Sequence, residues 1–233
     1  MDKVYFDIET DGLDATKVHC ICAVKDNDET MYNFIGEKPY EAFRDWLALE
    51  DVRVLVAHNG IGFDVPVLRR LSNDKWDFLI RDTLVLSRLA NPSLEGGHSL
   101  KAWGERIHNL KGDYEGGWEH YSTEMLEYCQ QDVRLLKDLY RRLEVLLEDF
   151  DDASIELEHK VAEIIHQQQL NGVLFDERKG YELLAELKER VLSIVLEVRE
   201  VFTPLPTWVE LTELKNPTRK DGSNSMAYQK QLD

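Results

Sequence analysis

The segment VYFDIE, residues 4–9, decides the fold, because it is a short apolar run of β-forming residues that contains two carboxylates. Asp7 and Glu9 are two positions apart, so on a strand their side chains project to the same face. Carboxylates on a buried strand are costly unless a cation neutralises them, and hard divalent cations prefer oxygen ligands. The segment therefore predicts a buried strand that holds a metal. A strand that merely runs into an acidic turn at Asp11-Gly12 would show the same pattern.

Around this segment the pattern predicts an α/β domain with a sheet of mixed direction. Residues 19–25 and 29–35 are predicted as two strands of a hairpin, and residues 52–57 as a strand buried on both faces. Helices are predicted at residues 40–49, 64–71, 83–89, 99–107, 123–129, 132–147, 154–170 and 177–202. In the last helix an apolar stripe must pack on something: Leu184, Leu187, Val191, Val195 and Val198.

Composition limits the possible functions. The 233 residues are 43% hydrophobic, which predicts a folded globular protein, and no apolar run approaches the roughly 20 residues that span a membrane. The N-terminus lacks the apolar core of a signal peptide, and three cysteines without zinc spacing indicate reduced thiols, so we expect a cytoplasmic protein. A formal charge of −17 predicts weak, salt-sensitive binding to nucleic acid, but metal ions at a carboxylate site would reverse the local sign.

A second carboxylate motif is HNGIGFD, residues 58–64, which follows the predicted strand 52–57 directly. If that strand neighbours residues 4–9, Asp64 lies at the same edge of the sheet as Asp7. The glycines in the loop allow the backbone to approach a ligand closely. A glycine-rich turn with Asp64 as a helix cap is the ordinary structural explanation.

A third motif is YCQQD, residues 128–132. Tyr128 and Asp132 are four positions apart, so on a helix they share one face, where Asp132 could bind a metal and the phenol could reach an attacking water. The same pair on an ordinary surface helix would need no function.

In combination, in this order and at these separations, the three motifs resemble those of the DEDD exonucleases. They are similar in particular to the proofreading 3′→5′ exonuclease domain of family A DNA polymerases. Tyr128 matches the DEDDy branch, because the DEDDh branch has a histidine where this chain has Glu127. Further stretches resemble the polymerases of short-tailed bacteriophages, and the likeness covers roughly residues 1 to 200: residues 82–89, 98–104, 111–114, 158–160 and 171–176.

The resemblance implies a ribonuclease H-like fold, a mixed five-stranded sheet flanked by helices and followed by a helical extension. We expect an exonuclease domain at residues 1–150, the helical extension at 151–202 and a flexible tail at 203–233. None of the polymerase active-site motifs is present in the chain. It is therefore expected to be a fragment or a separately encoded subunit, with a DNA polymerase domain or subunit as partner and no membrane.

The resemblance also implies a mechanism in which two divalent ions, Mg²⁺ with Mn²⁺ as an alternative, act at the scissile phosphate of a single-stranded DNA 3′ end. Its implied metal ligands are Asp7, Glu9, Asp64 and Asp132, with Tyr128 orienting the nucleophile. Thr10, Leu13 and Asn59 are implied substrate contacts, with Leu13 placed as a wedge against the terminal base. If the chain serves a phage, the host cytoplasm is the expected location.

Other predictions remain open at this stage. Arg88 and Lys101 could neutralise backbone phosphates or only solvate a helix, and no spacing requires His98 or His120 as ligands. An RNA 3′→5′ exonuclease would share the four carboxylates. A catalytically silent module that binds single strands or scaffolds a replication complex is the alternative from another class.

Overall fold

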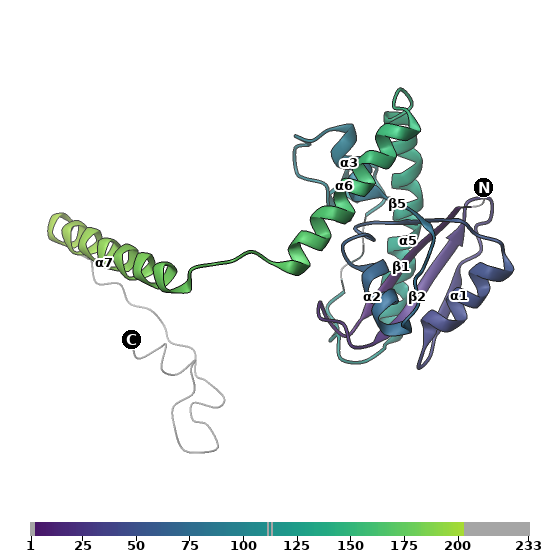
Figure 1. Ribbon diagram of the computed structural model, residues 1–233, viewed down its shortest axis with the longest axis horizontal. Coiled ribbons are helices and arrows are strands. Elements are labelled where there is room, and N and C mark those ends of the chain that lie inside the picture. Colours follow the sequence, from purple (N-terminus) through teal and green to yellow (C-terminus); the bar gives the residue numbers. More distant parts are fainter. Residues whose placement is uncertain (1–2, 111, 113, 203–233) are drawn as a thin grey trace, which may run out of the picture. The chain divides into compact units, whose positions relative to one another are not determined.

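The computed structural model describes residues 3–110, 112 and 114–202. The strands alternate with two helices in the first part of the chain, and from residue 83 onward the described elements are all helices (Figure 1). The elements in chain order are β1 Lys3–Thr10, β2 Val18–Lys25, β3 Tyr32–Ile35, α1 Pro39–Leu49, β4 Val54–Ala57, α2 Asp64–Ser72, β5 Leu79–Asp82, α3 Thr83–Ala90, α4 Leu100–Arg106, α5 Thr123–Leu146, α6 Asp152–Asn171 and α7 Glu177–Val201.

The strands form one five-stranded sheet in the order β3-β2-β1-β4-β5. β1 pairs antiparallel with β2 and parallel with β4, while β2–β3 is antiparallel and β4–β5 parallel. The predicted sheet of mixed direction is therefore confirmed. β1 lies at its centre, between β2 and β4, so every side chain on this strand meets a layer of helices or the edge where the strand ends.

The two faces of the sheet carry separate hydrophobic cores because side chains alternate along β1. Val4, Phe6 and Ile8 belong to the core that includes residues of α1 and α2. Tyr5 belongs to the core that includes residues of α3, α4 and α5. Asp7, two positions after Tyr5, therefore faces the α5 side, where α5 contacts both β1 and β2.

Two elements differ from the prediction. Residues 123–146 form one continuous helix, α5, where two helices were expected. Its buried positions recur every three or four residues and no glycine or proline interrupts them, so the helix runs on through Gln130 and Gln131. β5 was not predicted, because Leu79–Asp82 is four residues long and becomes a strand only by parallel pairing with β4.

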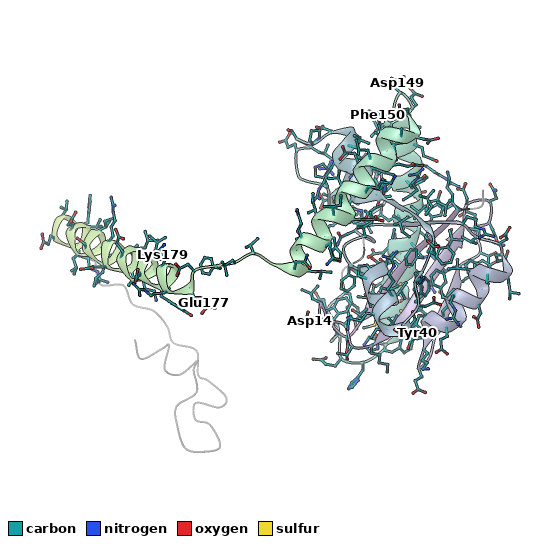
Figure 2. All side chains as sticks on the ribbon, in the orientation of Figure 1. Asp14, Tyr40, Asp149, Phe150, Glu177 and Lys179 are labelled. Carbon is teal, nitrogen blue, oxygen red and sulfur yellow. The ribbon has the colours of Figure 1, made fainter. Side chains whose placement is uncertain are left out.

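The chain divides into two compact units, residues 1–173 and residues 174–233. The predicted boundary at residue 150 falls between α5 and α6. In the second unit, α7 begins at a side-chain cap: the Asp176 carboxylate accepts a hydrogen bond from the Lys179 N–H at 3.1 Å. α7 has no buried residue, and side chains project along its whole length (Figure 2). The predicted tail, residues 203–233, lies outside the described residues. Within the described ranges, no helix is long and apolar enough to cross a membrane.

Lys137 is a buried lysine that ties α5 to the turn after β2. Its ammonium donates to the carbonyls of Lys25 at 3.0 Å and Asp28 at 3.2 Å and to the Glu29 carboxylate at 2.9 Å. Lys137→Ala removes these bonds and leaves a gap, so the free energy of unfolding should fall by about 2–3 kcal/mol in urea denaturation. Arg134→Ala, at an exposed position of the same helix, should change it by less than about 0.5 kcal/mol. Equal losses for the two variants would contradict this role.

Candidate functional site

β1 presents Asp7 and Glu9 on the face of the sheet that α5 covers. Their register partners on β2 are Cys22 and Cys20, and the register shifts between Glu9 and Thr10. Such an irregularity re-aims the chain at the end of a strand. Glu9 is only 6% exposed, whereas Asp7 is half-buried. The two carboxylates therefore sit where regular pairing ends and a cavity can open.

The loop after β4 is tightly turned. Asn59 adopts a left-handed conformation with φ of 63°. A Cβ added at Gly60 would lie 2.5 Å from the Cβ of Ala57, so this position requires glycine unless the chain shifts. The N–H of Val65 donates to the Gly60 carbonyl at 2.9 Å, and Asp64 lies in the first turn of α2. The turn thereby fixes the position of Asp64 at the start of α2.

Asp82, at the end of β5, stabilises this loop through hydrogen bonds. Its carboxylate accepts the backbone N–H groups of Asn59 at 2.9 Å, Ile61 at 3.0 Å and Leu84 at 2.9 Å. Its own N–H donates to Nε2 of His159 on α6 at 2.8 Å. Burial raises the pKa of Asp82, and the three N–H donors oppose that shift. Sequence reasoning missed Asp82, because its partners lie on loops and helices that are distant in the chain.

α5 brings Tyr128, Cys129 and Asp132 to the same place, with Asp132 only 3% exposed. Tyr128 belongs to an aromatic cluster: its ring centroid lies 5.8 Å from that of Tyr114 and 6.4 Å from that of Trp118. The carbonyl of Trp118 in turn lies 2.9 Å from Nε2 of His19 on β2. Tyr128 is therefore held by aromatic neighbours where it lines the cavity. Nothing in the local sequence pattern indicated Trp118.

All eight residues predicted for the site line one cavity of about 560 Å³. They are the four carboxylates, the tyrosine and the three expected substrate contacts: Asp7, Glu9, Asp64, Asp132, Tyr128, Thr10, Leu13 and Asn59. Four separate parts of the chain contribute them: β1 with the turn that follows it, the loop after β4, the start of α2, and α5. None of the predicted residues lies elsewhere.

The three expected substrate contacts differ in what they offer. The Thr10 hydroxyl donates to the Gly12 carbonyl at 2.9 Å, so it holds the turn after β1. Leu13 is 89% exposed at the rim of the cavity, which leaves its whole side chain available to a ligand. Asn59 is exposed as well. Leu13 and Asn59 are therefore better placed than Thr10 to touch a substrate directly.

The cavity is strongly acidic. Four carboxylates line it, and no lysine or arginine does among the residues that the structure describes. Burial raises the pKa of Asp64 to about 7, and the neighbouring Asp82 charge adds to this. A bound cation would favour the ionised form of these groups instead. Hard oxygen donors without a basic side chain fit a divalent ion such as Mg²⁺ or Mn²⁺.

Cys129 is a close neighbour that sequence reasoning did not identify. One ligand atom each of Asp7, Glu9 and Cys129 lie within 4.8 Å of one another. The thiol donates to the Asp7 carbonyl at 3.5 Å, and burial raises its pKa. A buried neutral thiol is a poor ligand for Mg²⁺. Cys129 therefore supports the backbone of Asp7, and the carboxylates remain the fitting donors.

Comparison with protein families agrees with the fold. Residues 4–88, from β1 to α3, match the model of the RNase_H superfamily. This segment contains the whole sheet and three of the four cavity carboxylates. The strand order and the match together define a ribonuclease H-like domain, as the sequence resemblance implied.

The chain is also similar to phage DNA polymerases. It is 29% identical over 261 residues to the DNA-directed DNA polymerase of Escherichia phage T7, and that match covers 84% of this chain and 36% of the relative. The DNA-directed DNA polymerase of Enterobacteria phage T3 gives the same identity and coverage. The resemblance to phage polymerases found in the sequence is thereby confirmed. The chain spans about a third of the length of these relatives.

Among solved structures, Brucella melitensis NrnC superposes with a TM-score of 0.57 at 23% identity, over 73% of this chain and 86% of that one. The structure of NrnC with bound Mg²⁺ gives a TM-score of 0.54 at 21% identity, over the same shares of the two chains. At these identities the likeness concerns the fold alone.

Protonation of His159 should break its hydrogen bond with the N–H of Asp82, the residue that binds the loop after β4. Its Nδ1 lies 2.7 Å from the Ile155 carbonyl and so carries the hydrogen, while Nε2 accepts from the Asp82 N–H, which requires a neutral ring. Burial lowers its pKa below the unfolded value of about 6.5. A group whose pKa is lower in the folded state stabilises the protein fully above its unfolded-state pKa. That stabilisation is lost as the pH falls through the folded-state pKa. The free energy of unfolding should therefore decrease below pH 6.5, by at most about 1.4 kcal/mol per pH unit.

His159→Gln is the matched control, because glutamine offers an acceptor and does not titrate. Arg81, Asp82 and Glu163 also face the ring, but they are present in both proteins. The wild-type protein should lose stability relative to the variant when urea unfolding is followed from pH 7 to pH 5. Parallel curves would mean that His159 does not carry the effect.

Proposed function

We propose that this chain is a 3′→5′ exonuclease that hydrolyses DNA, single strands or frayed primer ends, to 5′-mononucleotides, and that it proofreads in phage DNA replication. The observation that carries the proposal is one cavity in which carboxylates from β1, α2 and α5 meet a tyrosine. Three motifs, the first and last of which are more than a hundred residues apart, converge there. Similarity to phage DNA polymerases supports DNA as the substrate and replication as the setting.

The residues that would hold divalent ions are Asp7, Glu9, Asp64 and Asp132. Three of these four are less than 7% exposed, and a cluster so buried and so acidic needs cations to be stable in its ionised form. Asp7 would contribute to holding two ions, the first together with Glu9 and Asp132 and the second together with Asp64. Two divalent ions, when bound, supply an acidified water and neutralise the charge that develops on the leaving oxygen.

The remaining groups bind and orient. Tyr128, held by Tyr114 and Trp118, is proposed to orient the nucleophile through its phenol hydrogen bond. Leu13, exposed at the rim, is proposed to pack against the terminal base, and Asn59 to contact the terminal sugar or phosphate. Positioning of this kind supplies much of the catalysis in phosphoryl transfer, because the reacting atoms are brought into line.

The test is a 5′-labelled single-stranded DNA incubated with the protein and Mg²⁺, with EDTA, and with two variants. A descending ladder should form with Mg²⁺ and be absent with EDTA. Asp7→Ala should lower the rate at least about a hundredfold, and Tyr128→Phe about tenfold to a hundredfold.

Asp14→Ala is the matched control and should leave the rate unchanged. Asp14, labelled in Figure 2, is an exposed carboxylate near Asp7 in the chain, and it is not among the residues that line the cavity. A matched RNA oligonucleotide distinguishes the substrates: faster degradation of RNA would move the proposal to an RNA exonuclease. Binding of DNA without any metal-dependent cleavage would favour a silent binding module.

We also propose that a DNA polymerase domain or subunit is the partner of this chain. α7 carries an apolar stripe whose members are 39–60% exposed within their unit: Leu184, Leu187, Val191, Val195 and Val198. Exposed apolar surface of this extent marks a protein contact. Sedimentation with a phage polymerase that lacks its exonuclease domain should show a complex at micromolar concentration. Leu187→Glu with Val191→Glu should abolish it, whereas unchanged sedimentation of the wild-type mixture would contradict the proposal.

A further inference from the structure

A groove continues from the carboxylate cavity and differs from it in charge. The groove has a volume of about 990 Å³ and shares His58, Asn59 and Tyr128 with the cavity. Arg88 of α3 and Lys101 of α4 line it, against Glu115 as its one described carboxylate. We refer to it as the His98 groove. In a chain with a net charge of −17, this is a local site where cations outnumber carboxylates.

A second hollow of about 840 Å³ also adjoins Tyr128, and it is acidic. No lysine or arginine lines it in the part of the chain that the structure describes. Its carboxylates are Glu115, Glu119, Glu124 and Glu127. A phosphodiester strand leaving the cavity therefore meets attraction on one side and repulsion on the other, and charge favours the His98 groove.

Buried residues hold the ring of His98 in a defined orientation. Its Nδ1 lies 2.8 Å from the hydroxyl oxygen of Ser87, and that oxygen accepts the indole N–H of Trp103 at 2.8 Å. Ser87 is fully buried and Trp103 is 5% exposed. The indole donation occupies one lone pair of the serine oxygen and leaves the serine hydrogen available to Nδ1 of His98. In the tautomer in which Nδ1 accepts that hydrogen, the ring proton resides on Nε2, where it can be donated to a ligand in the groove.

A second buried hydroxyl, one turn earlier on α3, contacts a second histidine in the same way. Thr83, fully buried, donates to the Ala57 carbonyl at 3.2 Å, and its oxygen lies 2.9 Å from Nδ1 of His58. Thr83 and Ser87 are four residues apart and so share a face of α3. Two buried hydroxyls on one helix thus orient two histidine rings along the same groove. A half-exposed ring that merely filled surface space would not need a buried hydroxyl to hold it.

We propose that the His98 groove binds the sugar-phosphate backbone of the DNA strand on the 5′ side of the scissile nucleotide, with His98 donating from Nε2 to a phosphate oxygen and Arg88 neutralising its charge. The inference rests on the proposed exonuclease, whose site the groove extends. It makes this chain selective for single strands of several nucleotides over dinucleotides. It also assigns His98 a role that no sequence spacing indicated.

The first test measures binding by fluorescence anisotropy, with 5′-labelled thymidine dinucleotide and pentanucleotide and with Ca²⁺ in place of Mg²⁺. The wild-type protein should prefer the pentanucleotide, and His98→Ala should reduce that preference about tenfold, the effect of one hydrogen bond to a charged group. His98→Gln keeps an N–H near the position of Nε2 and should restore most of it. His120→Ala, a histidine of the acidic hollow, is the matched control and should leave the preference unchanged.

The second test identifies the ligand atom as a phosphate. Arg88→Gln should reduce the slope of log Kd against log salt by about 0.7, the value for one phosphate contact on a single strand. A methylphosphonate at one interior linkage removes the charge of that phosphate. Arg88→Gln should weaken binding of the charged strand and have little effect on the strand whose contacted phosphate is neutral. Equal effects on every methylphosphonate strand would show that Arg88 does not contact a particular phosphate.

Binding and cleavage fail separately. If the wild-type protein degrades DNA but His98→Ala and Arg88→Gln keep its Kd and its length preference, the groove assignment is wrong and the exonuclease stands. If no DNA is degraded but both variants lose the preference, the groove assignment stands without the exonuclease. A uniform loss on dinucleotide and pentanucleotide together would also overturn the assignment, because it would show an effect on the site or the fold.

Discussion

The hydrogen bonds of the buried Asp82 carboxylate are the interaction on which the candidate site depends. One buried carboxylate binds the N–H groups of Asn59 and Ile61 in the site loop and of Leu84 in the first turn of α3. The loop leads into Asp64, while α3 supplies the hydroxyls that orient His58 and His98. The carboxylate cavity and the His98 groove are thus set by the same residue. Because burying a carboxylate costs free energy, the three N–H donors are needed to keep it there.

The sequence predicted the parts of the site that are encoded locally. Strand alternation predicted that Asp7 and Glu9 share a face, and the helical repeat predicted the same of Tyr128 and Asp132. That these motifs form one site was implied by the family resemblance. The strand β5 could not be predicted, because Leu79–Asp82 has no period of its own and exists through pairing with β4. The positions of Trp118, Cys129 and His98 relative to the site could not be predicted, because they depend on contacts between segments distant in the sequence.

The overall charge of −17 is compatible with the proposed binding of nucleic acid because the charges are separated in space. The carboxylates that line the cavity require cations, so they attract metal ions and not phosphates. The acidic hollow repels a strand that would leave the cavity on the wrong side, and Arg88 with Lys101 attracts it on the other. An acidic protein can in this way direct a polyanion along one path, at the expense of weak and salt-dependent binding.

The role of α6 follows from the same network. Were α6 only an extension beyond the catalytic domain, its side chains would not need to enter the core. Instead His159 is 6% exposed and binds the backbone of Asp82, while Ile155 packs against the core beneath α5 and Ala162 against the core beneath α1 and α2. Removing α6 would leave the Asp82 N–H without its acceptor and would expose the parts of the two cores that Ile155 and Ala162 cover. We therefore place α6 within the folding unit of the site, which agrees with the division of the chain after residue 173. His159 thus connects α6 to Asp82, the residue whose carboxylate binds the loop that leads into Asp64.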